Sequence, residues 1–205
     1  ASAKVVVLGG GVAGQNAANI ALGMGADVTI LDTDLDKLRT IFWRWQNRIK
    51  QLASSTLAVR QQVLDADMVI GSVLIPGAKA PKLVTNEMVS AMKPGSVLVD
   101  IAVDQGGCFE DTHPTTHDDP TFRVHGSTFY CVANMPGAVP NTSTYALTNA
   151  TLPYALRLAR LGWRDALRAD PALALGLNTH GGSVTYQAVA DDLSLAYQPL
   201  AGVLA

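Results

Sequence analysis

The sequence has few cysteines, little net charge and no long uninterrupted apolar run. Its two cysteines, Cys108 and Cys131, lie far apart and form no CxxC pair, so nothing indicates a disulfide framework. The formal net charge of −2 leaves no basic footprint for nucleic acid. Gly, Pro or Asp interrupts the apolar stretches well short of a membrane span, and the first residues do not resemble a signal peptide. We therefore expect no nucleic-acid or membrane partner, and a reducing, cytoplasmic setting.

Apolar strand-like runs alternate with helix-like runs over the first two thirds of the chain. Hydrophobic residues make up 48% of the sequence, which allows a sizeable core. Strands are predicted at residues 4–8, 27–31, 68–74, 96–102 and 128–133, and helices at 13–24, 34–46, 57–66 and 85–92. This alternation predicts an α/β fold, a doubly wound parallel sheet of the Rossmann-like type with right-handed crossovers.

After Pro140 the pattern becomes mainly helical. Residues 142–161 predict a long helix, and Pro153 inside it predicts a kink or a helix restart. Residues 163–168 and 171–175 predict two short helical pieces, and the signals from residue 179 onward are weak. The chain therefore divides into an α/β domain over residues 1–140 and a helical extension over residues 141–205.

A glycine-rich turn follows the first predicted strand and opens the first predicted helix. Its pattern is Gly9-x-Gly11-x-x-Gly14. In a dinucleotide site the first glycine permits the tight turn, the second lets the backbone approach a pyrophosphate, and the third lets helix and strand pack closely. The helix N-terminus adds free N–H groups and the positive end of its dipole. The alternative is a glycine-rich turn with no ligand.

Asp32 ends the second predicted strand, at about the spacing expected for the acid that binds the adenosine ribose. A carboxylate at this place accepts hydrogen bonds from ribose hydroxyls and repels a 2′-phosphate, so NAD is favoured over NADP. Lys37 lies one turn into the next helix and could reach the adenosine side, or it could be a solvated surface lysine.

Three more strand exits carry polar or glycine residues: residues 71–81, 99–110 and 131–140. Ligands of open α/β sheets bind at such carboxyl ends. Asp104 precedes Gln105 and two glycines and could lie near a nicotinamide ribose, or it could simply turn a loop. Asn134 could bind a carboxamide or a ribose, or form an Asx-turn.

The histidines and cysteines give weaker signals. His113 and His117 are four residues apart, but Pro114 between them argues against a helical metal pair, so no metal site is predicted. Cys108 has no evident activating partner and is expected to be a small buried or half-buried thiol rather than a nucleophile.

Seven segments together resemble one known family, the alanine dehydrogenases. They are GGGVAGQNAA, LDTDLDKLR, GSVLIPGAKAPKLVT, MKPGSVLVDIAVDQGGCFE, HPTTHDDPTF, YCVANMPGAVPNTSTYALTNATLPY and GLNTH. The DQGGCFE and NMPGAVP segments are far more specific than the glycine loop. The related nucleotide-binding subunit of proton-translocating transhydrogenase typically has a different acidic segment where this chain has Val103 to Gly107, so the likeness favours alanine dehydrogenase.

The resemblance implies an NAD-dependent, reversible oxidative deamination of L-alanine to pyruvate and ammonium by a homohexamer. It places Gly9, Gly11, Val12, Ala13 and Gly14 at the pyrophosphate, Asp32 at the adenine ribose, and Lys37, Ser54, Val73 and Leu74 along the adenosine half. Ile101, Ala102, Val103, Val132, Ala133, Asn134 and Met135 would flank the nicotinamide half. Asp104 would be the catalytic carboxylate that helps proton transfer. A cofactor-binding arginine of the family corresponds to His113 here.

The resemblance covers only the carboxyl-terminal portion of that family. Alanine dehydrogenases begin with a substrate domain that supplies an arginine, a lysine and a histidine for the substrate, and no such segment is found here. Residues 141–205 would complete that domain. We therefore expect this chain to supply the cofactor half and to turn over alanine poorly by itself. A non-catalytic NAD-binding module and a transhydrogenase-like hydride-transfer subunit are the alternatives.

Overall fold

The computed structural model describes residues 1–204 and divides the chain into two compact units. The first unit comprises Ala1–Ile75 and Lys79–Met135, and the second comprises Pro76–Ala78 and the chain from Pro136 onward. Among the helices of residues 1–204, none combines the length and apolar character needed to cross a membrane.

The first unit is built on a seven-stranded sheet with the order β3-β2-β1-β4-β5-β7-β6. Its strands are β1 (Lys4–Leu8), β2 (Asp27–Asp32), β3 (Lys50–Ala53), β4 (Met68–Gly71), β5 (Val97–Asp100), β6 (Thr121–Val124) and β7 (Ser127–Tyr130). All neighbouring strands are parallel except β6, which runs antiparallel to β7. Its helices are α1 (Val12–Gly23), α2 (Leu35–Trp45), α3 (Thr56–Leu64), α4 (Asn86–Ser90) and the 3-10 turn η1 (Val103–Gln105).

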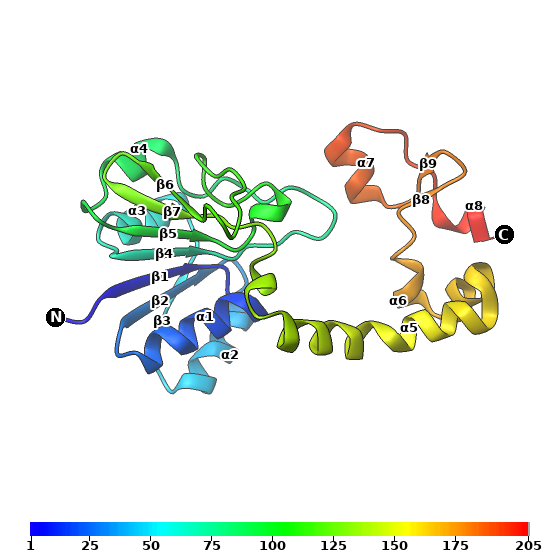
Figure 1. Cartoon of the computed structure of the whole chain (residues 1–205), viewed down its shortest axis with the longest axis horizontal. Coiled ribbons are helices and arrows are strands. Elements are labelled where there is room, and N and C mark those ends of the chain that lie inside the picture. The colour runs from blue at the N-terminus through cyan, green and yellow to red at the C-terminus, as the bar shows by residue number, and fades with distance from the viewer. Residues whose placement is uncertain (205) are drawn as a thin grey trace. The chain divides into compact units, whose positions relative to one another are not determined.

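Helices cover both faces of this sheet, which confirms the predicted doubly wound fold (Figure 1). Val5 and Val7 of β1 pack toward α1 and α2, in a cluster with Ile41 and Trp45. Val6 and Leu8, the alternate residues of the same strand, join the cluster on the other face, which contains residues of α3 and α4. A strand buried on both faces needs such a continuous apolar run.

Short polar side chains cap the starts of two helices of this unit. Asp34 is the N-cap of α2 and its side chain accepts hydrogen bonds from the backbone N–H groups of Asp36 and Lys37. Thr85 is the N-cap of α4 and accepts a hydrogen bond from the N–H of Met88. In each case a short polar side chain satisfies donors that the first turn of a helix leaves free.

Several strands of the seven-stranded sheet are shorter than predicted, and two strands of this sheet were missed. The runs at 68–74, 96–102 and 128–133 leave the sheet early, at Gly71, Asp100 and Tyr130, because their last residues form the loops at the carboxyl edge. β3 and β6 were not predicted because they are edge strands, with polar residues among their few apolar ones.

The 3-10 turn η2 (Met135–Ala138) begins at the last residue of the first unit, and the second unit contains the long helix α5 (Pro140–Ala169). It continues with α6 (Pro171–Ala174), the hairpin of β8 (Thr179–His180) and β9 (Ser183–Val184), α7 (Gln187–Leu193) and α8 (Leu200–Leu204). The helix does not restart at Pro153, which lies inside α5: the interruption lies at Gly162, whose φ of 74° and ψ of 161° are not helical. Proline has a helix-compatible φ, whereas the conformation of Gly162 is essentially restricted to glycine.

Candidate functional site

A cavity of about 830 Å³ opens at the carboxyl edge of the parallel strands in the first unit. This is the edge at which ligands of open α/β sheets bind, and its size is typical of small-molecule sites. Its wall is formed by Leu8, Gly9, Gly11, Val12, Ala13, Leu31, Asp32, Thr33, Lys37, Ser54, Ser72, Val73, Leu74, Ile75, Pro81, Leu83, Ile101 and Ala102.

The three glycines of the predicted motif have different steric surroundings. Gly9 has a φ of +100°, and a Cβ there would lie 2.9 Å from the carbonyl oxygen of Ser72. A Cβ on Gly14 would lie only 1.9 Å from the carbonyl oxygen of Gly9, so helix and turn are in direct backbone contact. Gly11 has nothing within 4 Å of its hypothetical Cβ. The first and third glycines are thus required by packing, and the second leaves the backbone open toward the cavity.

The N-terminus of α1 lies in the cavity wall. Its N-cap is Gly11, which offers no side-chain cap to the first turn. Val12 and Ala13 line the cavity, and Val12 is 82% exposed although it is apolar. Uncapped N–H groups and the positive end of the helix dipole make this end suited to a phosphate group.

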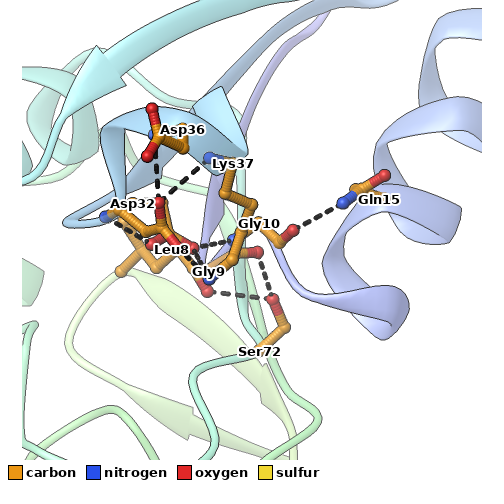
Figure 2. Close-up of polar contacts among 9 residues, drawn as sticks. Leu8, Gly9, Gly10, Gln15, Asp32, Asp36, Lys37 and Ser72 are labelled. Carbon is orange, nitrogen blue, oxygen red and sulfur yellow. Dashed lines mark hydrogen bonds and ion pairs between the residues drawn. The ribbon is translucent and has the colours of Figure 1, made fainter. Parts of the chain in front are cut away.

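Side chains from three other elements hold the glycine turn in place (Figure 2). The backbone N–H of Gly10 donates to Asp32 Oδ2 at 2.7 Å, and Gln15 Nε2 donates to the Gly10 carbonyl at 2.7 Å. Ser72 Oγ lies 2.9 Å from the carbonyl oxygens of both Leu8 and Gly9. Sequence reasoning missed Gln15 and Ser72 as site residues. The place of Ser72 in the predicted strand exit at residues 71–81 was the one signal that could have indicated it.

Asp32 is the last residue of β2 and is 9% exposed. It accepts hydrogen bonds from the N–H of Gly10, from the N–H of Asp34 at 2.9 Å and from Lys37 Nζ at 3.0 Å. Burial by itself raises the pKa of this carboxyl, but the hydrogen bonds and the Lys37 charge outweigh it, so the pKa lies below the ordinary 3.8. Asp32 is therefore a carboxylate at neutral pH, facing the cavity.

Lys37 lies in the cavity wall and forms an ion pair with Asp32, with its side chain 36% exposed. Its ammonium group offers further donors to a ligand that enters the cavity. Its contact with the adenosine half of a cofactor stays a prediction.

The structure brings together most of the residues predicted for the adenosine half. Ser54, Val73 and Leu74 line the same cavity as Asp32, as do Ile101 and Ala102 at the start of the loop after β5. Across the described residues the cavity wall does not include Gly14, Val103, Asp104 or the segment Val132, Ala133, Asn134 and Met135. The roles of all these residues stay predictions.

Asp104 lies in η1 with an exposed side chain, and it is close to a second predicted residue. The backbone N–H of Asn134 donates to Asp104 Oδ2 at 3.4 Å. Asn134 has a φ of +53°, in the left-handed region that asparagine tolerates better than most residues. Two loops that are separate in the sequence thus meet at the carboxylate predicted to be catalytic.

The cysteines and histidines do not form a reactive centre. Cys108 is fully buried, as predicted, and burial raises the pKa of its thiol to about 12. The ring of His113 stacks on Phe122 with centroids 3.7 Å apart, and His117 Nε2 lies 3.2 Å from the Asn134 carbonyl oxygen. Within residues 1–204 no group of three or more His, Cys, Asp or Glu side chains is placed to hold a metal ion.

Comparison with known proteins gives one consistent family. The family described as "Alanine dehydrogenase/PNT, C-terminal domain" matches residues 1–187. Alanine dehydrogenase of Mycolicibacterium smegmatis is 59% identical over all of this chain, which corresponds to 55% of the relative. A solved L-alanine dehydrogenase superposes with a TM-score of 0.81 at 45% identity, over 99% of this chain and 54% of that one.

A transhydrogenase from Sinorhizobium meliloti also superposes, with a TM-score of 0.71 at 29% identity, over 91% of this chain and 50% of that one. The chain spans about half the length of the curated relatives it matches. By fold, by sequence and by the geometry of its glycine turn, the chain belongs to the family of alanine dehydrogenase/PNT carboxyl-terminal domains.

Proposed function

We propose that this chain is the NAD-binding part of an alanine dehydrogenase, which catalyses the reversible conversion of L-alanine, water and NAD to pyruvate, ammonium and NADH. The observation that carries the proposal is that the open glycine turn and Asp32, which is bonded to that turn, line one cavity. The identity of about 60% to alanine dehydrogenases over the whole chain supports the choice of reaction.

The family and the fold together imply NAD as the cofactor, and the residues present fit it. The first turn of α1 would hold the pyrophosphate through the N–H groups around Val12 and Ala13. Asp32 would accept hydrogen bonds from the adenosine ribose and would repel a 2′-phosphate, so NAD is preferred to NADP. Ser54, Val73 and Leu74 would enclose the adenosine half.

The loop after β5 and the loop after β7 would enclose the nicotinamide half. Ile101, Ala102 and Val103 come from the first loop, and residues 132–135 come from the second. When bound, NAD supplies the acceptor for the hydride that leaves the alanine Cα. Asp104 would take part in the proton transfer that accompanies this step, because it is an exposed carboxylate where the two loops meet.

Turnover needs more than the cofactor half. The chain spans about half the length of its curated relatives, and we assign residues 1–140 to the NAD domain and residues 141–205 to the substrate domain. The groups that clamp the alanine carboxylate would come from the rest of the substrate domain. Positioning by such groups supplies several kcal/mol of barrier reduction. We further propose a homohexamer in the cytoplasm, as the family resemblance implies.

The test has two steps. NAD is first titrated into the 205-residue chain by calorimetry, and L-alanine is then added to this chain and to the full-length natural protein while NADH absorbance is followed. We expect both to bind NAD and the full-length protein to form NADH, with little or none from the chain alone. Failure of the chain to bind NAD would refute the assignment of the cavity as the NAD-binding site. Alanine turnover by the chain alone at a normal enzyme rate would refute the proposal that turnover needs the rest of the substrate domain.

A second candidate is a transhydrogenase-like subunit that passes hydride to a partner chain, which the superposition at a TM-score of 0.71 favours. The two candidates differ in their hydride donor. Reduction of a second nicotinamide nucleotide by NADH, with no response to alanine, would support the second candidate against the first.

A further inference from the structure

The loop that carries Asp104 is a compact turn. It runs from the end of β5 through η1 to Gly106 and Gly107, which have φ angles of +89° and +77°. The N–H of Gly107 donates to the carbonyl of Ala102 at 3.0 Å, which closes the turn on itself. Asp104 therefore has a fixed place only if the two ends of this turn are fixed.

One buried carboxylate joins those two ends. Asp100 is the last residue of β5 and is fully buried, with 0% exposure. Its Oδ1 accepts from the N–H of Ala102 at 3.1 Å, before Asp104 in the chain. Its Oδ2 accepts from the N–H of Cys108 at 2.7 Å, the N–H of Phe109 at 3.3 Å and Thr112 Oγ1 at 2.6 Å, all after Asp104.

Burying a carboxylate at this position costs free energy. Central strands of parallel sheets are normally apolar, and a buried charge is tolerated only when its hydrogen bonds are satisfied. Burial raises the pKa of Asp100 above its ordinary value, although the four donors oppose this effect. The loop is built around the carboxylate: a Cβ on Gly107 would lie 2.6 Å from Asp100 Oδ2 and 2.4 Å from Thr112 Cγ2.

A second charged side chain holds the same loop by its carbonyl groups. Lys82 Nζ donates to the carbonyl oxygen of Gly106 at 2.5 Å and to that of Phe109 at 2.8 Å. Asp100 thus binds the N–H groups of the loop while Lys82 binds its carbonyl groups. Charged partners make both sets of hydrogen bonds stronger than neutral ones.

We propose that Asp100 is a positioning residue for the reaction, which with Lys82 holds the loop so that Asp104 points at the reacting substrate. This inference rests on the proposed function. It separates Asp100 from the residues proposed to hold the pyrophosphate and the adenosine ribose, because the glycine turn and Asp32 lie on β1, α1 and β2. Loss of the anchor should therefore lower turnover much more than it weakens NAD binding.

The test uses the full-length natural protein with four variants. Asp100→Asn keeps the shape but replaces one acceptor oxygen by an NH₂ group, which then faces an N–H donor. Thr112→Val removes a single donor at constant volume, and Thr112→Ser restores it. Ser127→Ala is the control, because Ser127 is a buried residue of the same sheet whose side-chain partner, Ser96, lies at the other end of the strands.

Three quantities are measured: hydrogen exchange of the peptides covering residues 101–112, the Kd for NAD, and kcat with L-alanine. For Asp100→Asn we expect exchange in 101–112 to rise by about ten-fold or more, while the glycine turn is unchanged. We expect kcat to fall by about ten-fold or more, because small misplacements of reacting groups are costly, and the Kd for NAD to move by less than about three-fold. Thr112→Val should show a smaller change in the same direction, and Thr112→Ser should reverse it.

The proposal is overturned if Thr112→Val matches Ser127→Ala in both loop exchange and kcat, or if Asp100→Asn weakens NAD binding as much as it lowers kcat. Asp100→Asn could also unfold the protein, in which case the two Thr112 variants decide the question. If the wild-type protein does not oxidise alanine, the proposed function fails. Loop exchange then still decides whether Asp100 holds the loop, so the two failures are distinguishable.

Discussion

Asp32 accepts from three donors at one carboxylate: the N–H of Gly10 in the glycine turn, the N–H of Asp34 at the start of α2, and the ammonium of Lys37. Its spacing from the glycines predicted its place at the end of a strand, because that spacing is set by one β-α-β unit. Ser72 and Gln15 were not predictable in the same way. Ser72 contacts Gly9 across 63 positions of sequence, a proximity that only the folded sheet creates.

Replacing Asp32 by alanine should weaken NAD binding and relax the choice of nucleotide. Losing charged hydrogen bonds to the ribose costs about 1.5–3 kcal/mol each, so we expect the Kd for NAD to rise by roughly ten- to hundred-fold. The preference over NADP should shrink, because the repulsion of a 2′-phosphate disappears and Lys37 loses its ion pair with Asp32. Calorimetry with both nucleotides measures this. Asp36→Ala is the control, since Asp36 is a highly exposed acid in the first turn of α2, just after Asp32, and an equal effect there would contradict the assignment.

The lowered pKa of Asp32 also predicts how stability depends on pH. A carboxyl whose pKa is lower in the folded chain stabilises the fold above its unfolded value, near the ordinary 3.8, and this stabilisation is lost as pH falls through the folded pKa. We expect the free energy of unfolding to be lower for Asp32→Asn than for wild type at pH 7. The difference should diminish below about pH 4. Denaturant unfolding at several pH values measures it, and a difference that grows in acid would show that the sign is wrong.

Substitutions at two glycines of the turn should affect stability and NAD binding differently. Gly14→Ala forces a Cβ into the Gly9 carbonyl oxygen, so we expect a loss of roughly 3 kcal/mol in the free energy of unfolding. Gly11→Ala meets no protein atom within 4 Å and should cost less than about 1 kcal/mol, through its weaker N-cap. Its methyl group would nevertheless obstruct the approach of a pyrophosphate, so NAD affinity should fall. If Gly11→Ala bound NAD with wild-type affinity, the placement of the pyrophosphate at Gly11 would be contradicted.

At the scale of elements, the sequence predicted the central strands better than the edges. The interiors of β1 and β2 are mostly apolar because both faces are covered, and their predicted bounds agree with the structure to within one residue. β3 and β6 lie at the two edges of the sheet, where one side needs no partner and polar residues are tolerated, so the apolar pattern was too weak to find them. The carboxyl ends of β4 and β5 were overextended because apolar residues continue into the cavity wall, at Val73, Leu74, Ile101 and Ala102.

The break in α5 predicts how a substitution at Gly162 changes the stability of the second unit. Gly162 combines a φ of 74° with a ψ of 161°, which costs other residues about 1–3 kcal/mol. Gly162→Ala should therefore destabilise the second unit by about that amount. The matched control is Gly23→Ala, at the end of α1, where φ is not positive and no atom lies within 4 Å. That change should be neutral or stabilise the chain by about 0.5 kcal/mol. Thermal unfolding followed by circular dichroism compares the two, and equal effects would mean that Gly162 does not set the break.

At the scale of the whole molecule, α5 presents an apolar stripe to solvent. Leu147, Tyr154 and Leu161 recur every seven residues, which places them on one side of the helix, and they are 66%, 45% and 50% exposed. A stripe of this kind normally marks a surface that another element or molecule covers. The chain spans only about half the length of its curated relatives, so the 205-residue chain by itself should bury this stripe by self-association.

Sedimentation velocity over a range of concentrations tests this expectation. The average mass of the chain should rise above that of a monomer as concentration increases, and Leu147→Glu should shift it back because a charge in an apolar contact is costly. Leu57→Glu is the control, since Leu57 is a leucine of α3 with 64% exposure in the other unit. A wild-type chain that remains a monodisperse monomer throughout would contradict the argument. An equal response to both substitutions would show that total apolar surface, rather than the stripe on α5, drives association.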